Sequence, residues 1–145
     1  MDITHGKYLG VDYGDKRTGL AECDLSGQLA SGICTISEGG MRKTAERVKK
    51  EAESRGCKKI IVGLPKNMDG SEGPRADVVK AFVQLLSEIT EIPIEFWDER
   101  MSTMAAYRFL DGAGTFGKKR KEVIDTLSAE LILQGYLDRE RNSIK

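Results

Sequence analysis

The fold is decided near the start of the chain, by the stretch Tyr8-Leu9-Gly10-Val11-Asp12-Tyr13-Gly14-Asp15-Lys16-Arg17-Thr18-Gly19-Leu20-Ala21. A short apolar strand at 8–11 leads into Asp12, and a polar turn leads into a second extended run at 18–22. The glycines of this stretch permit a tight turn and a close approach of the backbone to a ligand. A carboxylate at the end of a buried strand can ligate a hard cation, although an aspartate there can equally cap a hairpin turn.

The segments that follow alternate between extended and helical patterns. The expected elements are strands at 8–11, 18–22 and 29–36, a helix at 41–55, a strand at 58–65, a helix at 75–88, a strand at 92–97, and helices at 103–110 and 119–139. Three antiparallel strands followed by two strands reached through helices predict an α/β fold, with a mixed five-stranded sheet and helices on both faces. The length of 145 residues predicts a single domain covering 1–145. Sites in such sheets collect at the carboxyl ends of the strands.

Composition narrows the class of protein. The 23 basic and 23 acidic residues cancel, so binding to an anionic partner must come from local clusters. Cys23, Cys34 and Cys57 lie far apart without a CxxC pattern and indicate reduced core thiols in a cytoplasmic protein. We find neither an export signal nor an apolar run long enough for a membrane span. The single histidine, His5, is expected to be solvated, which argues against a zinc site or a histidine-based triad.

Four acidic residues are candidates for one site. Asp12 ends the first strand, Asp98 and Glu99 end the fifth, and Asp125 lies in the last helix, on a face that also carries the small residues Ser128 and Ala129. Carboxylates that converge repel each other unless cations neutralise them. Mg²⁺ or Mn²⁺ suits such oxygen ligands, and two ions about 3.5–4 Å apart can activate water and stabilise the leaving oxygen of a phosphodiester. Taken singly, each acid has a plain structural explanation, such as an ion pair with Arg100 or solvation on a helix face.

Four motifs together carry a family resemblance over almost the whole chain. They are Gly10-Val11-Asp12-Tyr13-Gly14-Asp15-Lys16-Arg17-Thr18-Gly19; Val62-Gly63-Leu64-Pro65 with the loop from Asn67 through Gly70 and Gly73 to Ala76; Asp98-Glu99-Arg100-Met101-Ser102-Thr103; and the helix from Asp125 through Ser128-Ala129 to Leu137. This pattern resembles the YqgF (RuvX-like) family, relatives of the Holliday-junction resolvases in the RNase H-like superfamily, whose members are named pre-16S rRNA nucleases. One departure is Ser128, where the family usually has alanine.

The resemblance implies an RNase H-like fold and metal-dependent cleavage of structured nucleic acid. It implies that the metal ligands are Asp12, an acid of the Asp98–Glu99 pair, and Asp125. Strand alternation places Asp98 and Glu99 on opposite faces, and we favour Glu99 as the ligand, with Asp98 as its supporting partner. All four acids are therefore candidate catalytic residues, and the expected cofactor is Mg²⁺ or Mn²⁺, bound as two ions.

Positive and polar side chains near these motifs are candidates for binding nucleic acid through its phosphates, without reading its sequence. The candidates are Lys16, Arg17, Asn67, Arg75, Arg100, Lys118, Lys119, Arg120 and Lys121. The Lys/Arg run before Asp125 can also be read as the solvated entry to a helix. The glycines next to it, in a loop expected at 111–118 to be mobile, favour a flexible clamp. The length of the loop at 66–74 indicates an element that faces substrate.

The leading hypothesis is a cytoplasmic hydrolase of ribosome biogenesis, a nuclease that processes the 5′ end of pre-16S rRNA. Its partners would be pre-rRNA and ribosomal particles, with no membrane. No residue in the sequence indicates whether the substrate is RNA or branched DNA. Holliday-junction resolution is therefore an alternative with the same chemistry. A second class is a non-catalytic module that binds nucleic acid or ribosomes without a divalent ion. A third is a phosphotransferase, against which a single domain argues. Endo- or exonucleolytic cleavage, and a monomer or a homodimer, stay open.

Overall fold

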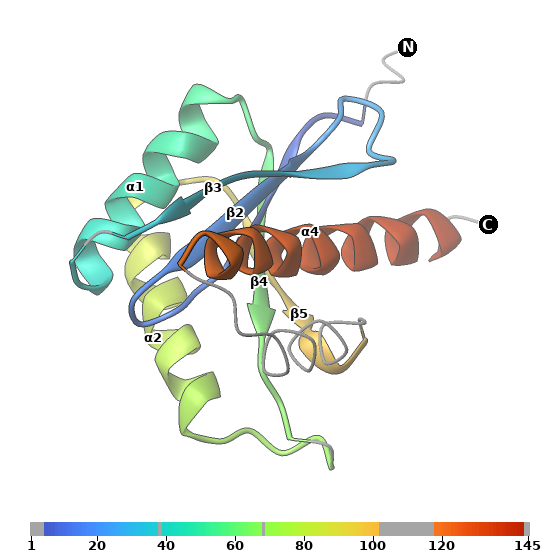
Figure 1. Cartoon of the computed structure of the whole chain (residues 1–145). Helices are drawn as coiled ribbons and strands as arrows, with labels where there is room; N and C mark the ends of the chain where they lie inside the picture. The colour runs from blue at the N-terminus through green and yellow to red at the C-terminus, as the bar shows by residue number, and fades with distance from the viewer. Residues whose placement is uncertain (1–4, 38, 68, 102–117, 144–145) are drawn as a thin grey trace.

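The structure, a computed structural model, describes residues 5–37, 39–67, 69–101 and 118–143; of 101, 118–125 and 143 it describes only the backbone. Figure 1 shows the arrangement. The elements are β1 (Tyr8–Asp12), β2 (Thr18–Cys23), β3 (Ala30–Ile36), α1 (Met41–Ser54), β4 (Lys59–Leu64), α2 (Pro74–Ile89), β5 (Ile94–Asp98), the 3₁₀ turn η1 (Glu99–Met101) and α4 (Lys118–Ser143). The helix and loop expected at 103–110 and 111–118 fall almost entirely outside the described residues.

The predicted sheet is confirmed. Its strands lie in the order β3-β2-β1-β4-β5. The pairs β1–β2 and β2–β3 are antiparallel, and the pairs β1–β4 and β4–β5 are parallel. Each strand differs from its predicted bounds by one or two residues, and the differences in β1 and β5 concern the site. β1 includes Asp12 because this residue pairs with Gly19. β5 begins only after Pro93, which has no amide to donate, and extends to Asp98, which pairs with Leu64.

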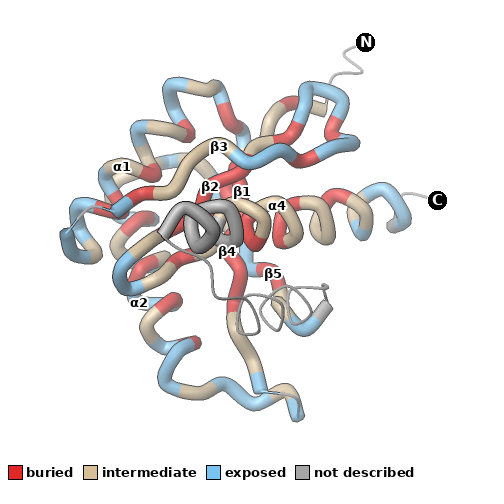
Figure 2. The backbone as a smooth tube through the Cα atoms, viewed as in Figure 1, coloured by how far each residue is buried: buried red, intermediate tan, exposed pale blue. Residues whose placement is uncertain are grey.

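Helices cover both faces, as expected from the alternation of side chains along a strand. Leu9 and Val11 of β1 point into a core with α1 and α2 that contains Val48 and Phe82. Tyr8 points to the opposite face, into a core formed with α4. Figure 2 shows buried residues along the central strands and exposed residues on the outer turns of the helices. By the same alternation Gly10 and Asp12 belong to the α4 face. Asp12 therefore lies on the side of the sheet that α4 covers.

The helix α4 packs very close to the sheet. A Cβ placed on Gly10 would lie 2.8 Å from the carbonyl oxygen of Ala129 and 2.8 Å from Cβ of Leu133, which leaves no space for a side chain at this position of β1. Further along, the carboxylate of Glu140 accepts a hydrogen bond from the hydroxyl of Tyr8, at 2.9 Å. Residue numbers rise along α4 as they fall along β1, so α4 runs antiparallel to β1.

The same helix also holds the outer strand β3. The side chain of Gln134 accepts a hydrogen bond from the amide of Ala30, at 2.9 Å, and Glu130 accepts one from the amide of Gly32, at 2.6 Å. These bonds satisfy backbone donors of an edge strand that would otherwise face solvent. Side chains of α4 therefore take the place of a further strand at this edge.

One prediction about the amino-terminal segment is wrong. His5 is not simply solvated: its Nε2 lies 2.7 Å from the carboxylate of Glu140, and its Nδ1 donates to the carbonyl of Gly6, at 2.7 Å. The ring also packs against Tyr8, with 4.3 Å between ring centroids. The segment before β1 thus folds onto the carboxyl-terminal half of α4.

Cys23 and Cys57 are buried free thiols, as predicted, and burial raises the pKa of both. Cys34 differs because it is only partly buried on the edge strand β3. In the described parts of the chain, no helix combines the length and the apolar character that crossing a membrane requires.

Candidate active site at the carboxyl ends of β1, β4 and β5

Two of the predicted acids end neighbouring parts of the sheet. Asp12 is the last residue of β1, and Asp98 the last of β5, with Glu99 directly after it. β4 runs between these strands, and the register pairs Val11 with Val62. Because paired strands lie about 4.8 Å apart, the ends of β1 and β5 are separated by two strand spacings. A side chain must reach back across β4 to bring the acids together.

Glu99 reaches back in this way. Gly63 lies in β4 opposite Trp97 of β5, on the α4 face. A Cβ on Gly63 would stand 3.2 Å from Cγ of Glu99, so the Glu99 side chain lies over this glycine. Its Cγ thereby lies on the same face of the sheet as Asp12, over β4, on the β1 side of its own strand. Any larger residue at 63 would fill this space.

Asp98 behaves differently. Its carboxylate is held by Arg100, whose Nε lies 3.1 Å from both carboxylate oxygens and whose Nη2 lies 2.7 Å from Oδ2. The amide of Arg100 also donates to Oδ1, at 3.0 Å. The hydrogen bond from the Arg100 guanidinium holds the pKa of Asp98 below its usual value. By strand alternation Asp98 points away from α4, so the geometry favours Glu99 over Asp98 as the partner of Asp12.

The position of Asp125 follows from the path of α4. This residue lies one helical turn before Ala129, which packs over Gly10. Since α4 is antiparallel to β1, the turn that carries Asp125 lies towards the Asp12 end of the strand. The side chains of Asp125 and of the predicted basic cluster Lys118, Lys119, Arg120 and Lys121 lie outside the described part of the structure. Among the side chains that are described, no three Asp, Glu, His or Cys residues form a group suited to a metal.

Comparison with known proteins identifies the family. Residues 6–139 match the model of a family described as "RuvX: Holliday junction resolvase". The chain belongs to the RuvX family. RuvX relatives in Clostridioides difficile and Thermoanaerobacter pseudethanolicus, both named "Putative pre-16S rRNA nuclease", are each 47% identical to it. The alignments cover 95% and 94% of this chain and 98% and 99% of the relatives. These names indicate a nuclease, a hydrolase acting on ester bonds.

Solved structures confirm the fold predicted for this RuvX chain. It is similar to RuvC of T. thermophilus in complex with a Holliday junction substrate, with a TM-score of 0.60 and 12% sequence identity. The similarity covers 94% of this chain and 97% of RuvC. A second RuvC structure, from Thermus thermophilus, gives a TM-score of 0.56 at 13% identity. At this identity the likeness concerns the RNase H-like fold alone.

The side chains that sequence analysis predicted to bind nucleic acid differ in what they contact in this RuvX structure. Lys16 is exposed in the β1–β2 turn, and Arg17 beside it is half-buried. Asn67 closes its own loop by donating to the hydroxyl of Ser71, at 2.9 Å. Arg100 holds Asp98, and Arg75 donates to Tyr13 and Asp15 in the β1–β2 turn. Three of the predicted contacts, Asn67, Arg75 and Arg100, are therefore already bound to groups within the protein.

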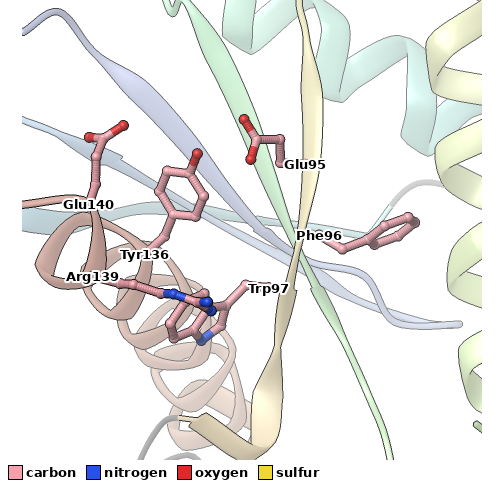
Figure 3. A pocket seen from close by; sticks show the side chains of 6 residues that line it. All are labelled: Glu95, Phe96, Trp97, Tyr136, Arg139 and Glu140. Carbon is pink, nitrogen blue, oxygen red and sulfur yellow. The ribbon is translucent and has the colours of Figure 1, made fainter. Parts of the chain in front are cut away.

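A pocket of about 370 Å³ lies away from the acids, between β5 and the carboxyl-terminal half of α4. Figure 3 shows Trp97, Tyr136 and Arg139 on one side of β5 and Phe96 on the other. Lys59, next to the pocket, lies 2.9 Å from the carboxylate of Glu95 and donates to the hydroxyl of Tyr136, at 2.8 Å. Sequence analysis missed this cluster. Glu95 and Trp97 alternate along a strand, and Tyr136, Arg139 and Glu140 recur at helical spacing, which is the pattern that core residues also follow.

Proposed function

We propose that this RuvX protein is a metal-dependent nuclease that hydrolyses phosphodiester bonds of structured RNA, with the 5′ end of pre-16S rRNA as its substrate. The nuclease class comes from the family, and the choice of RNA comes from the names of relatives that are 47% identical over almost their whole length. The protein would act in the cytoplasm on ribosomal precursor particles. The observation that carries the catalytic part is the placement of Asp12 and Glu99 on one face of the sheet, at the carboxyl ends of its strands.

The residues at the carboxyl ends of these strands fit a hard divalent cation. Asp12 and Glu99 offer oxygen ligands only, and the missing side chain at Gly63 lets Glu99 lie over β4, towards the strand that carries Asp12. We assign Asp12 and Glu99 as ligands of Mg²⁺ or Mn²⁺ and Asp125 as the third, because its helical turn lies towards the same end of β1. Two such ions, when bound, supply a water of lowered pKa and stabilise the leaving oxygen of a phosphodiester.

The remaining side chains position the substrate and the ligands. The ion pair with Arg100 keeps Asp98 on the far face and fixes the start of η1, which sets the direction of Glu99. Lys16 lies exposed four residues after Asp12, where an ammonium group can hold a backbone phosphate next to the acids. We propose the same role for Lys118, Lys119, Arg120 and Lys121, at the start of the helix that carries Asp125.

A second candidate activity is the resolution of branched DNA. The family description names a Holliday junction resolvase, and the same acids would cleave either kind of backbone. Recognition of RNA depends on groups that read the 2′-hydroxyl or the wide minor groove of an A-form helix. The two substrates are therefore to be compared directly with one preparation of the protein.

The decisive experiment pairs Mn²⁺ calorimetry with cleavage assays on Asp12→Asn. We expect the wild-type protein to take up Mn²⁺ and cut a pre-16S rRNA fragment, and the variant to stay folded while losing both properties. Asp77→Asn is the matched control, because Asp77 is an exposed carboxylate in the first turn of α2. Cutting of a four-way DNA junction in preference to the RNA would support the second candidate. RNA binding by the wild-type protein without uptake of Mn²⁺ would contradict the enzyme and favour a binding module.

A further inference from the structure

Arg75 links the beginning of α2 to the turn that follows Asp12. Its Nη2 donates to the carbonyl oxygen of Tyr13, at 2.5 Å, and its Nη1 lies 3.1 Å from Oδ1 of Asp15. The planar guanidinium presents its donors in a fixed fork, which suits two acceptors on one turn. The contact to Asp15 is exposed, with 76% of the Asp15 side chain accessible, so the bond to the main chain of Tyr13 is the one that constrains the turn.

Tyr13 is held against α2 by its ring as well. The ring stacks on Phe82, with 4.2 Å between centroids and 18° between planes. Both residues are buried: 6% of Tyr13 and none of Phe82 is accessible. The residue after Asp12 is therefore fixed to α2 at both its side chain and its carbonyl group.

Fixing Tyr13 also fixes the direction of Asp12. Alternation along β1 directs Asp12 to the α4 face, and Tyr13, the first residue after the strand, packs in the core on the opposite face. Holding Tyr13 on α2 therefore restrains the backbone next to Asp12. Within the turn itself, the amide of Gly14 donates to the hydroxyl of Thr18 at 3.3 Å, a long hydrogen bond. The contact from Arg75 is the shorter of the two, so we expect the turn to depend on it.

We propose that Arg75 is a positioning residue for the metal site, acting through Tyr13 to orient Asp12, and that it is not a phosphate contact. This inference rests on the proposed function, because it takes Asp12 to be a metal ligand. Residues that orient a metal ligand from behind typically change metal affinity or activity by about 10- to 100-fold when they are replaced. Arg75 acts one residue further away, so we expect the lower end of that range.

Three measurements on Arg75→Ala test the proposal: Mn²⁺ affinity without RNA, RNA affinity against salt concentration without divalent ions, and amide hydrogen exchange at residues 13–17. We expect Mn²⁺ affinity to fall about tenfold, exchange in the turn to become faster, and the salt dependence of RNA binding to stay unchanged. Arg75→Lys should recover part of the Mn²⁺ affinity, since an ammonium group can still donate to Tyr13. It also serves as the second variant should the alanine protein be unstable.

Lys80→Ala is the matched control, because it removes one exposed cation of the same helix that pairs with Glu72 and not with the β1–β2 turn. It should leave all three measurements unchanged. Unaltered Mn²⁺ affinity in Arg75→Ala, with the salt slope of RNA binding reduced by about one, would overturn the proposal and make Arg75 a phosphate contact. Failure of the wild-type protein to bind Mn²⁺ would instead refute the proposed function itself and this inference with it.

Discussion

The side chain of Glu99 lies across Gly63, with Cγ 3.2 Å from the point where a Cβ on that glycine would stand. The same point lies 2.5 Å from Cδ1 of Ile132 in α4. Substitution Gly63→Ala therefore overfills the space between sheet and helix, and we expect it to lower the free energy of unfolding by about 1–3 kcal/mol and to weaken Mn²⁺ binding. Urea unfolding and calorimetry measure these two effects. Gly39→Ala is the control, since no atom lies within 4 Å of the added methyl group, and equal stability of the two variants would contradict the prediction.

The two adjacent acids Asp98 and Glu99 should respond differently to loss of charge. Glu99→Gln is expected to reduce Mn²⁺ affinity at least tenfold, while Asp98→Asn, which only loosens the turn that directs Glu99, should reduce it less. Asp98→Asn should lower stability by less than about 1 kcal/mol, because it removes a partly exposed ion pair with Arg100. Arg100 lowers the pKa of Asp98, so this contribution is complete above about pH 4 and is lost as the pH falls through the lowered pKa. The reverse order of Mn²⁺ affinities would move the ligand to Asp98.

Tyr8 should ionise only at unusually high pH. Burial and the hydrogen bond to Glu140 raise its pKa to about 12. The raised pKa favours the neutral phenol in the folded protein, so its stabilising contribution is complete below pH 10 and is lost as the pH rises through about 12. We expect the unfolding free energy to fall more steeply over this range in the wild-type protein than in Tyr8→Phe. Tyrosinate absorbance measures the ionisation directly, and a Tyr8 signal that appears near pH 10 in the folded protein would be incompatible with this reading.

Lys16 tests the electrostatic part of substrate binding. Lys16→Ala should weaken RNA binding to a similar extent for different sequences and reduce the slope of log affinity against log salt by about 0.7–0.9. Anisotropy titrations between low and moderate salt without divalent ions give this slope. Lys50→Ala, which removes an exposed lysine in the second half of α1, should change neither affinity nor slope. The same response in both variants would indicate attraction by overall charge and no defined contact.

Local patterns were sufficient for the sheet but not for the details of the site. Alternation along β1 and β4 and the helical periods of α1 and α2 depend on neighbouring residues, so the order of elements along the chain, the mixed sheet and its two covered faces could be predicted. The choice between Asp98 and Glu99 could not, because the chain leaves the strand for a 3₁₀ turn after Asp98 and alternation no longer applies. The contacts of His5 with Glu140 and of Arg75 with Tyr13 join residues far apart along the chain, and no periodic pattern encodes such pairs.

Glu130 and Gln134 accept hydrogen bonds from amides of β3, so the contact between α4 and the sheet can be followed by spectroscopy. The amide protons of Gly32 and Ala30 are protected by side chains of α4, so their exchange with deuterium reports how often the last helix lifts from the sheet. Asp125 lies nearer the beginning of the same helix. A metal ion bound by Asp125 should therefore hold α4 on the sheet and slow amide exchange at Gly32 and Ala30. A nuclear magnetic resonance spectrum could then follow metal loading without observing the acids themselves.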